Sequence, residues 1–278
     1  MLPSSATPPA STMFRKGLSD PVWPTATTVA EAAGFVDDRI NEGADYIKLI
    51  AESGGAFGFQ LPHVPLEIHA AVIAEAHARG KMVMAHAMTL HETEQLVDAG
   101  ADGIASANVF VVPTLTPLAS IVGLSHSTDL AQDPRVAGKL SPELRAHLSD
   151  TFGGLPASHF DMALATIAAL REAGVDVIAG TDAAALAVRG VTHGASLHGE
   201  LQLFVQAGFS PAEALRSATS LTARRFGLHD RGRVEQGLRA DLILVDGDPT
   251  TTINDSLSIR AVWRQGTRLA AASTLGSR

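Results

Sequence analysis

The chain has 278 residues, which is enough for one large α/β domain with a small appendage. Its formal net charge of -8 leaves no basic face to neutralise phosphates, which argues against nucleic acid as a partner. The sequence contains no cysteine, so disulfides, thiolate ligands and a cysteine nucleophile are excluded, and any metal must be held by His, Asp, Glu or a modified Lys. There is no signal-peptide pattern and no apolar run of membrane-spanning length, so we expect a cytoplasmic protein without membrane contact.

The first half of the chain alternates helix-like segments with short apolar runs. Residues 1–27 are rich in Pro, Ser and Thr and predict an irregular N-terminal segment. Helical periodicity, caps and closing glycines predict helices over 28–40, 65–79 and 90–99, and strands over 45–50 and 82–86. Repeated helix–Gly–strand units predict a parallel sheet covered by helices.

This alternation breaks after Gly100. Residues 101–107 and 108–115 each have the composition of a strand, yet almost nothing lies between them. Two neighbouring parallel strands need a connecting segment of roughly a dozen residues or more. The two runs therefore predict either one long bent strand or a missing βα unit.

The second half begins with a loop and short helices over 117–155, among which Ser141-Pro-Glu-Leu is a good helix start. We then expect helices over 158–173, 197–207, 210–219 and 222–226, a buried strand over 176–182, and tail strands over 241–245 and 259–263. The predicted fold is α/β, a partial or distorted TIM-type (β/α)8 barrel over 28–227 with a small β appendage over 228–278.

Three polar residues lie late in apolar runs, namely Lys48, His86 and Asp182. The carboxyl ends of parallel barrel strands are where catalytic groups lie, so we take these three residues as one candidate site. Each also has a structural alternative. Asp182 could cap a helix or form a salt bridge, Lys48 could reach solvent from the strand end, and His86 could be a hydrogen-bonded core histidine. Together they suggest a site with N and O ligands, which suits Zn²⁺ or a similar ion.

The remaining histidines and glycines carry weaker signals. His193 and His198 stand five apart, a spacing that does not share one helix face, so His198 and Glu200 are expected to orient loops and not to form a second metal centre. Four further histidines are expected at the surface: His63, His69, His77 and His91. The loop over 53–58 lacks the ending of a phosphate loop and predicts a connection or lid.

Several motifs resemble the amidohydrolase superfamily, most closely its imidazolonepropionase-like and prolidase-like branches. They are Gly43-Ala-Asp-Tyr-Ile-Lys48, Lys81-Met-Val-Met-Ala-His86-Ala, Gly180-Thr-Asp182, Leu197-His-Gly-Glu-Leu201 and Asp241-Leu-Ile-Leu-Val245 with the turn that follows. The resemblance covers nearly everything after residue 28. It implies a distorted (β/α)8 barrel and one or two divalent ions, most often Zn²⁺. It also implies that Asp182 is metal ligand and general base, His86 a ligand, and Lys48 a carboxylated bridging lysine.

The resemblance further implies a hydrolase in which a metal-activated water attacks an amide-type C–N bond, an ester or a lactam of a small, possibly peptide-like substrate. Two features depart from the family: the sequence has no His-x-His pair, and it lacks the histidine expected after the sixth strand. We therefore expect a C-terminal portion with an internal deletion. The alternative is an inactive remnant that serves as an interaction module, by forming a homo-oligomer or by pairing with a complementary fragment.

Overall fold

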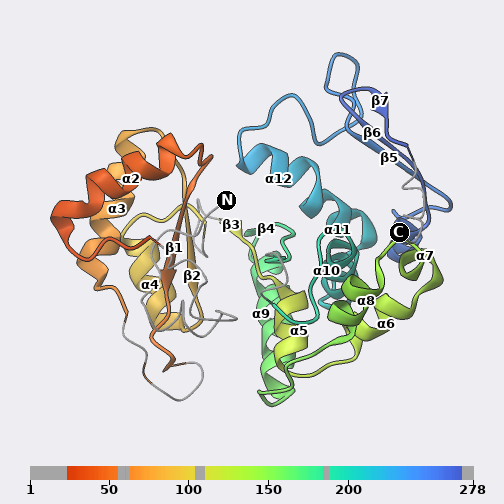
Figure 1. Cartoon of the computed structure of the whole chain (residues 1–278), viewed down its shortest axis with the longest axis horizontal. Helices are drawn as coiled ribbons and strands as arrows, with labels where there is room; N and C mark the ends of the chain where they lie inside the picture. The colour runs from red at the N-terminus through yellow and green to blue at the C-terminus, as the bar shows by residue number, and fades with distance from the viewer. Residues whose placement is uncertain (1–23, 56–59, 61–62, 104–109, 184–187, 271–278) are drawn as a thin grey trace. The chain divides into compact units, whose positions relative to one another are not determined.

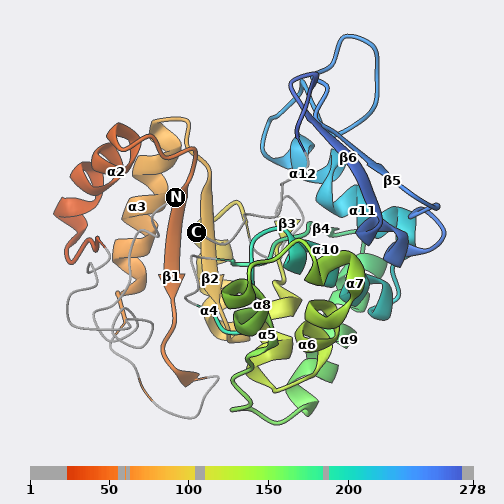
Figure 2. The same cartoon turned by 45° about the vertical axis from the view of Figure 1, so that its right-hand side comes forward.

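The structure is a computed structural model that describes residues 24–55, 60, 63–103, 110–183 and 188–270. The chain divides into two compact units, Met1–Val111 and Val112–Arg278. Figure 1 labels the elements of both units along the chain, and Figure 2 shows them from a second direction.

Unit one is built from alternating helices and strands. Its elements are η1 (Val29–Glu31), α2 (Ala32–Asn41), β1 (Ile47–Ala51), α3 (Leu66–Ala78), β2 (Val83–Ala87), α4 (Leu90–Asp98) and β3 (Phe110–Val111). Three helix-terminating glycines, Gly43, Gly80 and Gly100, have positive φ, the conformation that lets a glycine end a helix. Thr89 and Glu92 form a capping box at the start of α4. The helices and strands predicted over 28–99 are thus confirmed to within a few residues.

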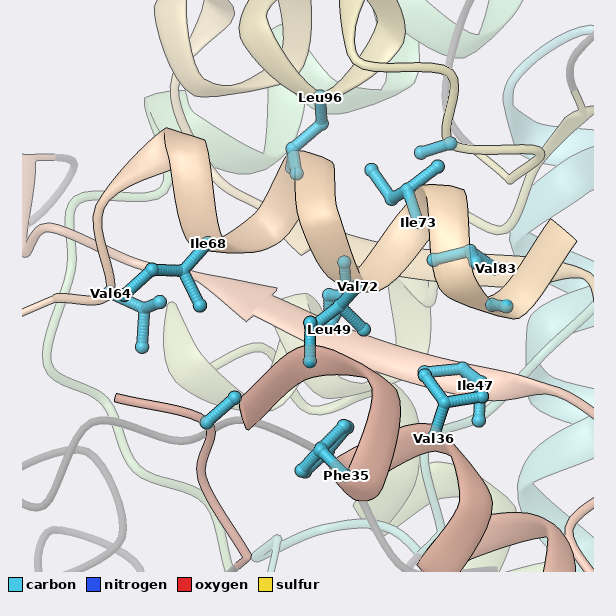
Figure 3. Packing of buried hydrophobic residues seen from close by; sticks show 14 of the residues in the cluster. Phe35, Val36, Ile47, Leu49, Val64, Ile68, Val72, Ile73, Val83 and Leu96 are labelled. Carbon is cyan, nitrogen blue, oxygen red and sulfur yellow. The ribbon is translucent and has the colours of Figure 1, made fainter. Parts of the chain in front are cut away.

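Strands β1 and β2 are parallel neighbours and pair in register from Ile47 with Val83 to Ala51 with Ala87. The apolar side chains of one face form the core of unit one with helices α2, α3 and α4. Figure 3 shows Phe35 and Val36 of α2 and Val72 of α3 around Ile47 and Leu49 of β1. Burying such side chains contributes roughly 1.5–3 kcal/mol each, so this face fixes the register of the two strands.

Unit two is mainly helical and ends in a small sheet. Its elements are α5 (Leu115–Ile121), α6 (His126–Gln132), α7 (Pro134–Ala137), α8 (Pro142–Ser149), α9 (Ser158–Glu172), β4 (Asp176–Val177), α10 (Ala195–Gln206), α11 (Pro211–Ala218), α12 (Ser220–Arg225), β5 (Leu242–Val245), η3 (Ile253–Leu257), β6 (Ile259–Arg264) and β7 (Thr267–Arg268). Ser141 and Ser210 cap α8 and α11 as predicted. The tail strands are confirmed as an antiparallel sheet of order β5-β6-β7.

Two strand predictions were wrong in extent. In the described part of the apolar run over 108–115, residues 110–115, only Phe110–Val111 are a strand, because Pro113 and the left-handed Thr114 end the extended backbone and Leu115 already begins α5. The strand expected over 176–182 is regular only at Asp176–Val177. Much of the irregular junction after Gly103 lies outside the described residues, as do most of the N-terminal segment and part of the loop over 53–58.

The described residues show α/β character, and their strands do not form a closed ring. Gly103 adds a parallel bridge beside Met84, which extends the β1–β2 pair in the direction that the predicted sheet requires. No helix in the described ranges is long and apolar enough to cross a membrane.

Candidate metal centre

Lys48 and His86 lie on the same face of the β1–β2 pair. Side chains alternate between faces along a strand, and Ile47, Leu49, Val83 and Ala85 belong to the face that packs against the helices. Register pairs Lys48 with Met84 and Ile50 with His86, so the lysine and the histidine both lie on the opposite face, with the histidine nearer the carboxyl end. Both residues are half-buried. The two side chains thus share a face, but Lys48 is the second residue of β1 and does not lie at its carboxyl end as expected.

Glu52 joins this surface and was missed from the sequence. It directly follows β1, and its Oε2 atom lies 3.6 Å from Nε2 of His86. Glu52 is only 6% exposed. Its Oε1 accepts a 2.6 Å hydrogen bond from the backbone N–H of Gly54, whereas its buried Oε2 has no hydrogen-bond partner in the described part of the chain. The available signal was its spacing, since Lys48, Ile50 and Glu52 follow the two-residue period of one strand face.

The loops after β1 and β2 are held together by Glu92 at the start of α4. Its Oε1 accepts the backbone N–H of Ser53 at 2.8 Å, and its Oε2 accepts that of Thr89 at 3.0 Å. Burial raises the pKa of Glu92, but the hydrogen bonds from Ser53 and Thr89 outweigh it and lower this pKa to about 2. Glu92 is therefore charged at neutral pH, and its hydrogen bonds fix the backbone next to Glu52.

Asp182 belongs to unit two, where it is exposed and its backbone is left-handed, with φ of 48°. Aspartate tolerates that conformation better than most residues. Among the described residues Asp182 forms no salt bridge, and residues 184–187, which a helix capped by Asp182 would contain, lie outside the described residues. The preceding Gly180 is required by close packing, because a Cβ atom there would lie 2.3 Å from Cγ1 of Val112.

The prediction that His69 lies at the surface was wrong. This α3 side chain is 2% exposed, and its Nε2 atom has no hydrogen-bond partner among the described residues. Burial, together with the nearby charge of His63, lowers the pKa of His69 to about 4, and a hydrogen bond to the backbone of Ile50 raises it. His69 is therefore neutral at pH 7. His63, His77 and His91 are exposed as predicted.

His198 and Glu200 have structural roles in unit two, as expected. Nδ1 of His198 lies 3.0 Å from the hydroxyl oxygen of Ser256. The carboxylate of the fully buried Glu200 accepts the backbone N–H groups of Leu115 and Thr116, both at 2.8 Å. Glu200 therefore caps α5, whose own N-cap residue, Thr114, makes no side-chain cap.

The side chains of unit one fit a divalent metal in donor chemistry. His86 offers an imidazole nitrogen and Glu52 a buried carboxylate oxygen, and these are the atoms that Zn²⁺ and similar ions bind. Lys48 lies on the same face and would add a further oxygen donor if carboxylated. Within the described ranges, three or more His, Asp or Glu side chains do not gather in one cluster, so His86 and Glu52 are a partial ligand set.

Comparison with known proteins shows the family of the chain. The model of the amidohydrolase family matches residues 30–269, which is most of the chain. The chain belongs to the amidohydrolase family. The matched range begins before β1 and ends after β7, so both units are included.

The solved structures most like this one include prolidase-like members of the family. A Xaa-Pro dipeptidase with bound methionine is 25% identical with a TM-score of 0.66, and the match covers 91% of this chain and 63% of that chain. A putative prolidase from Bifidobacterium longum is also 25% identical, with a TM-score of 0.63. This match covers 92% of this chain and 63% of that chain. These matches confirm the prolidase-like branch inferred from the motifs.

A curated relative carries another activity in its name. The 5-methylthioadenosine/S-adenosylhomocysteine deaminase of Halobacterium salinarum is 33% identical over 176 residues, which is 60% of this chain and 39% of the deaminase. The matches to these three proteins cover between 39% and 63% of their lengths, so this chain spans only part of each of them.

Proposed function

We propose that this chain carries part of the active site of a metal-dependent hydrolase that cleaves a carbon–nitrogen bond in a small molecule. The observation that carries the proposal is the placement of Lys48 and His86 on one face of two parallel neighbours, with the family match. This face lies opposite the one that packs against the helices of unit one, and in barrels of this class the carboxyl ends of the strands bear the reactive groups.

The residues proposed to hold the metal are Lys48 as its carboxylated form, His86 and Asp182. A divalent ion such as Zn²⁺, as one or two ions, would polarise the substrate carbonyl and make water a better nucleophile. The chain itself supplies the proton transfer. The exposed carboxylate of Asp182 takes the proton of the attacking water and returns it to the leaving nitrogen.

The substrate class that we favour is a peptide-like amide. The Xaa-Pro dipeptidase and the putative prolidase superpose on 91% and 92% of this chain and support this choice. Deamination of an adenosine-type compound is the second candidate, supported by the higher identity of 33% in the shorter match. Both reactions replace a C–N bond with a C–O bond, so the metal-binding residues serve either. Cytoplasmic location and self-association remain predictions of this proposal.

The first test is metal content by mass spectrometry on protein purified without chelator, with Asp182→Ala beside the natural sequence. We expect roughly one or more zinc-like ions per chain, and less in the variant. The same preparation is then assayed with Xaa-Pro dipeptides for released proline, and with adenosine-type compounds for released ammonia. A folded protein that neither retains nor rebinds metal would contradict the proposal and favour the inactive interaction module.

A further inference from the structure

The geometry of Glu52 points to a role that the family resemblance does not give it. A carboxylate that is 6% exposed is costly unless both oxygens have hydrogen-bond partners, yet Oε2 has no such partner in the described structure. The adjacent Oε1 is held by Gly54, and the Ser53 backbone is held by Glu92. The orphaned oxygen is therefore fixed in place from two sides.

The neighbour of that oxygen is Nε2 of His86, at 3.6 Å. This separation is too long for a hydrogen bond. Two ligands that each lie about 2.0–2.2 Å from one zinc ion at a tetrahedral angle are about 3.4 Å apart. The observed spacing is thus close to that of two donors in one coordination shell, and the two atoms present the nitrogen and the oxygen that such a shell accepts.

We propose that Glu52 is a metal ligand that binds the same divalent ion as His86 through Oε2. This inference rests on the proposed function, since it needs the metal that the function requires. Glu52 would add a carboxylate ligand to a chain whose sequence contains no His-x-His pair to supply metal ligands. With the carboxylated Lys48 on the same face, unit one then offers one nitrogen donor and two oxygen-donor groups.

A charge-paired Glu52 and His86 without metal is the competing explanation, and zinc affinity separates the two. The full chain is freed of metal and titrated with Zn²⁺ against a chromophoric chelator, and the Co²⁺ form is recorded by visible absorption. We expect Glu52→Gln to weaken zinc binding by more than about 100-fold, beyond the 10–100-fold typical of residues that only orient ligands. The Co²⁺ absorption spectrum of this variant should also change in shape.

Glu92→Gln is the matched control, because it makes the same charge change one loop away at a carboxylate whose oxygens already have backbone partners. We expect it to weaken zinc binding by no more than the roughly 10–100-fold typical of residues that only orient ligands. An equal loss in both variants would overturn the ligand role and leave loop positioning as the cause. If Glu52→Gln does not fold, Glu52→Asp replaces it; this variant keeps the charge but withdraws the oxygen, and an unchanged Co²⁺ spectrum would contradict the inference.

The outcomes also separate this inference from the proposed function. If the natural protein and Glu52→Gln bind zinc equally well, Glu52 is not a ligand, and the proposal of a metal-dependent hydrolase is unaffected. Natural protein that is folded but binds no zinc would overturn both.

Discussion

Two buried glutamates, one in each unit, show how differently the same side chain is used. Glu200 is fully buried in unit two, and it accepts the N–H groups of Leu115 and Thr116 and the hydroxyl of Thr116. Glu52 is almost as buried in unit one, yet only one of its oxygens has a hydrogen-bond partner among the described residues.

The difference lies in what surrounds each carboxylate. Glu200 faces the amino end of α5, where unpaired N–H groups and the helix dipole favour negative charge. Glu52 faces a histidine nitrogen on the neighbouring strand, at a distance that leaves room for a shared ion. A carboxylate whose donors are all supplied by the fold is structural, whereas one left incomplete beside another metal-binding side chain is a candidate for function.

The largest expected effect comes from deleting each of the two glutamate side chains and comparing the loss of stability. Glu200→Ala should lower the free energy of unfolding by about 3–5 kcal/mol, because two backbone N–H groups and a hydroxyl lose their acceptor inside the protein. In metal-free protein, Glu52→Ala should change it by about 1 kcal/mol or less, since one lost hydrogen bond is offset by removal of an unpaired buried oxygen. Urea unfolding at pH 5.5 measures both.

The comparison would be wrong if both deletions cost the same. A loss at Glu52 as large as that at Glu200 would make Glu52 a structural residue, and its unpaired oxygen would then need another explanation. Glu213→Ala is a suitable reference, because this capping glutamate is near the surface and its loss should cost about 1 kcal/mol.

The second prediction concerns pH. Burial raises the pKa of Glu200 to about 7, although hydrogen bonds from Thr116 and Leu115 act in the opposite direction. The folded chain then keeps this proton up to about pH 7, whereas the unfolded chain releases it near the usual 4.5. Stability from this group is complete below about pH 4.5 and is lost as the pH rises through 7. The loss should approach about 3 kcal/mol, at 1.4 kcal/mol per pH unit.

Glu200→Gln isolates that trend, because an amide does not titrate. The buried His69 works in the opposite direction: its lowered pKa means that the unfolded chain takes up a proton as the pH falls below about 6.5, which removes stability. The difference in unfolding free energy between natural protein and Glu200→Gln cancels the histidine. That difference should fall between pH 5 and pH 8, and a flat difference would contradict a raised pKa at Glu200.

The third prediction compares how much zinc stabilises the natural protein and variants of the two glutamates. At a free concentration 100 times the dissociation constant, zinc should stabilise the natural protein by about 2.7 kcal/mol, because the ion binds the folded chain. Thermal unfolding with zinc and with chelator measures this gain. Glu200→Gln should keep it, and Glu52→Gln should lose most of it at the same zinc concentration. Equal gains in the three proteins would remove the functional distinction between the two carboxylates.

Sequence reasoning located the regular elements of this fold well because the signals were local. Thr89 with Glu92, Ser141 and Ser210 are caps within one helical turn, and the closing glycines stand directly beside the helices that they end. The two parallel strands that carry Lys48 and His86 were predicted, whereas the shared face of the two residues comes from the strand register.

The errors came from partners distant in sequence. Periodicity alone did not show that Leu115 starts a helix, because the group that caps it is Glu200, 85 residues away. His69 was assigned to the surface, but its ring is buried and hydrogen bonds to the backbone of Ile50. Glu52 was overlooked because the adjacent Ser-Gly-Gly sequence indicated a loop, although its spacing from Lys48 places it on the same strand face.

The smallest expected change in stability comes from the third carboxylate of the argument, Asp182. It is exposed and has no hydrogen bond or salt bridge with the described residues, and asparagine also tolerates its left-handed backbone. Asp182→Asn should therefore alter the unfolding free energy by no more than about 0.5 kcal/mol in metal-free protein. If Asp182 is a ligand and base, the same variant should retain less zinc and show no hydrolysis. Unchanged stability with unchanged zinc content would remove Asp182 from the site, whereas a large loss of stability would give it a structural role like that of Glu200.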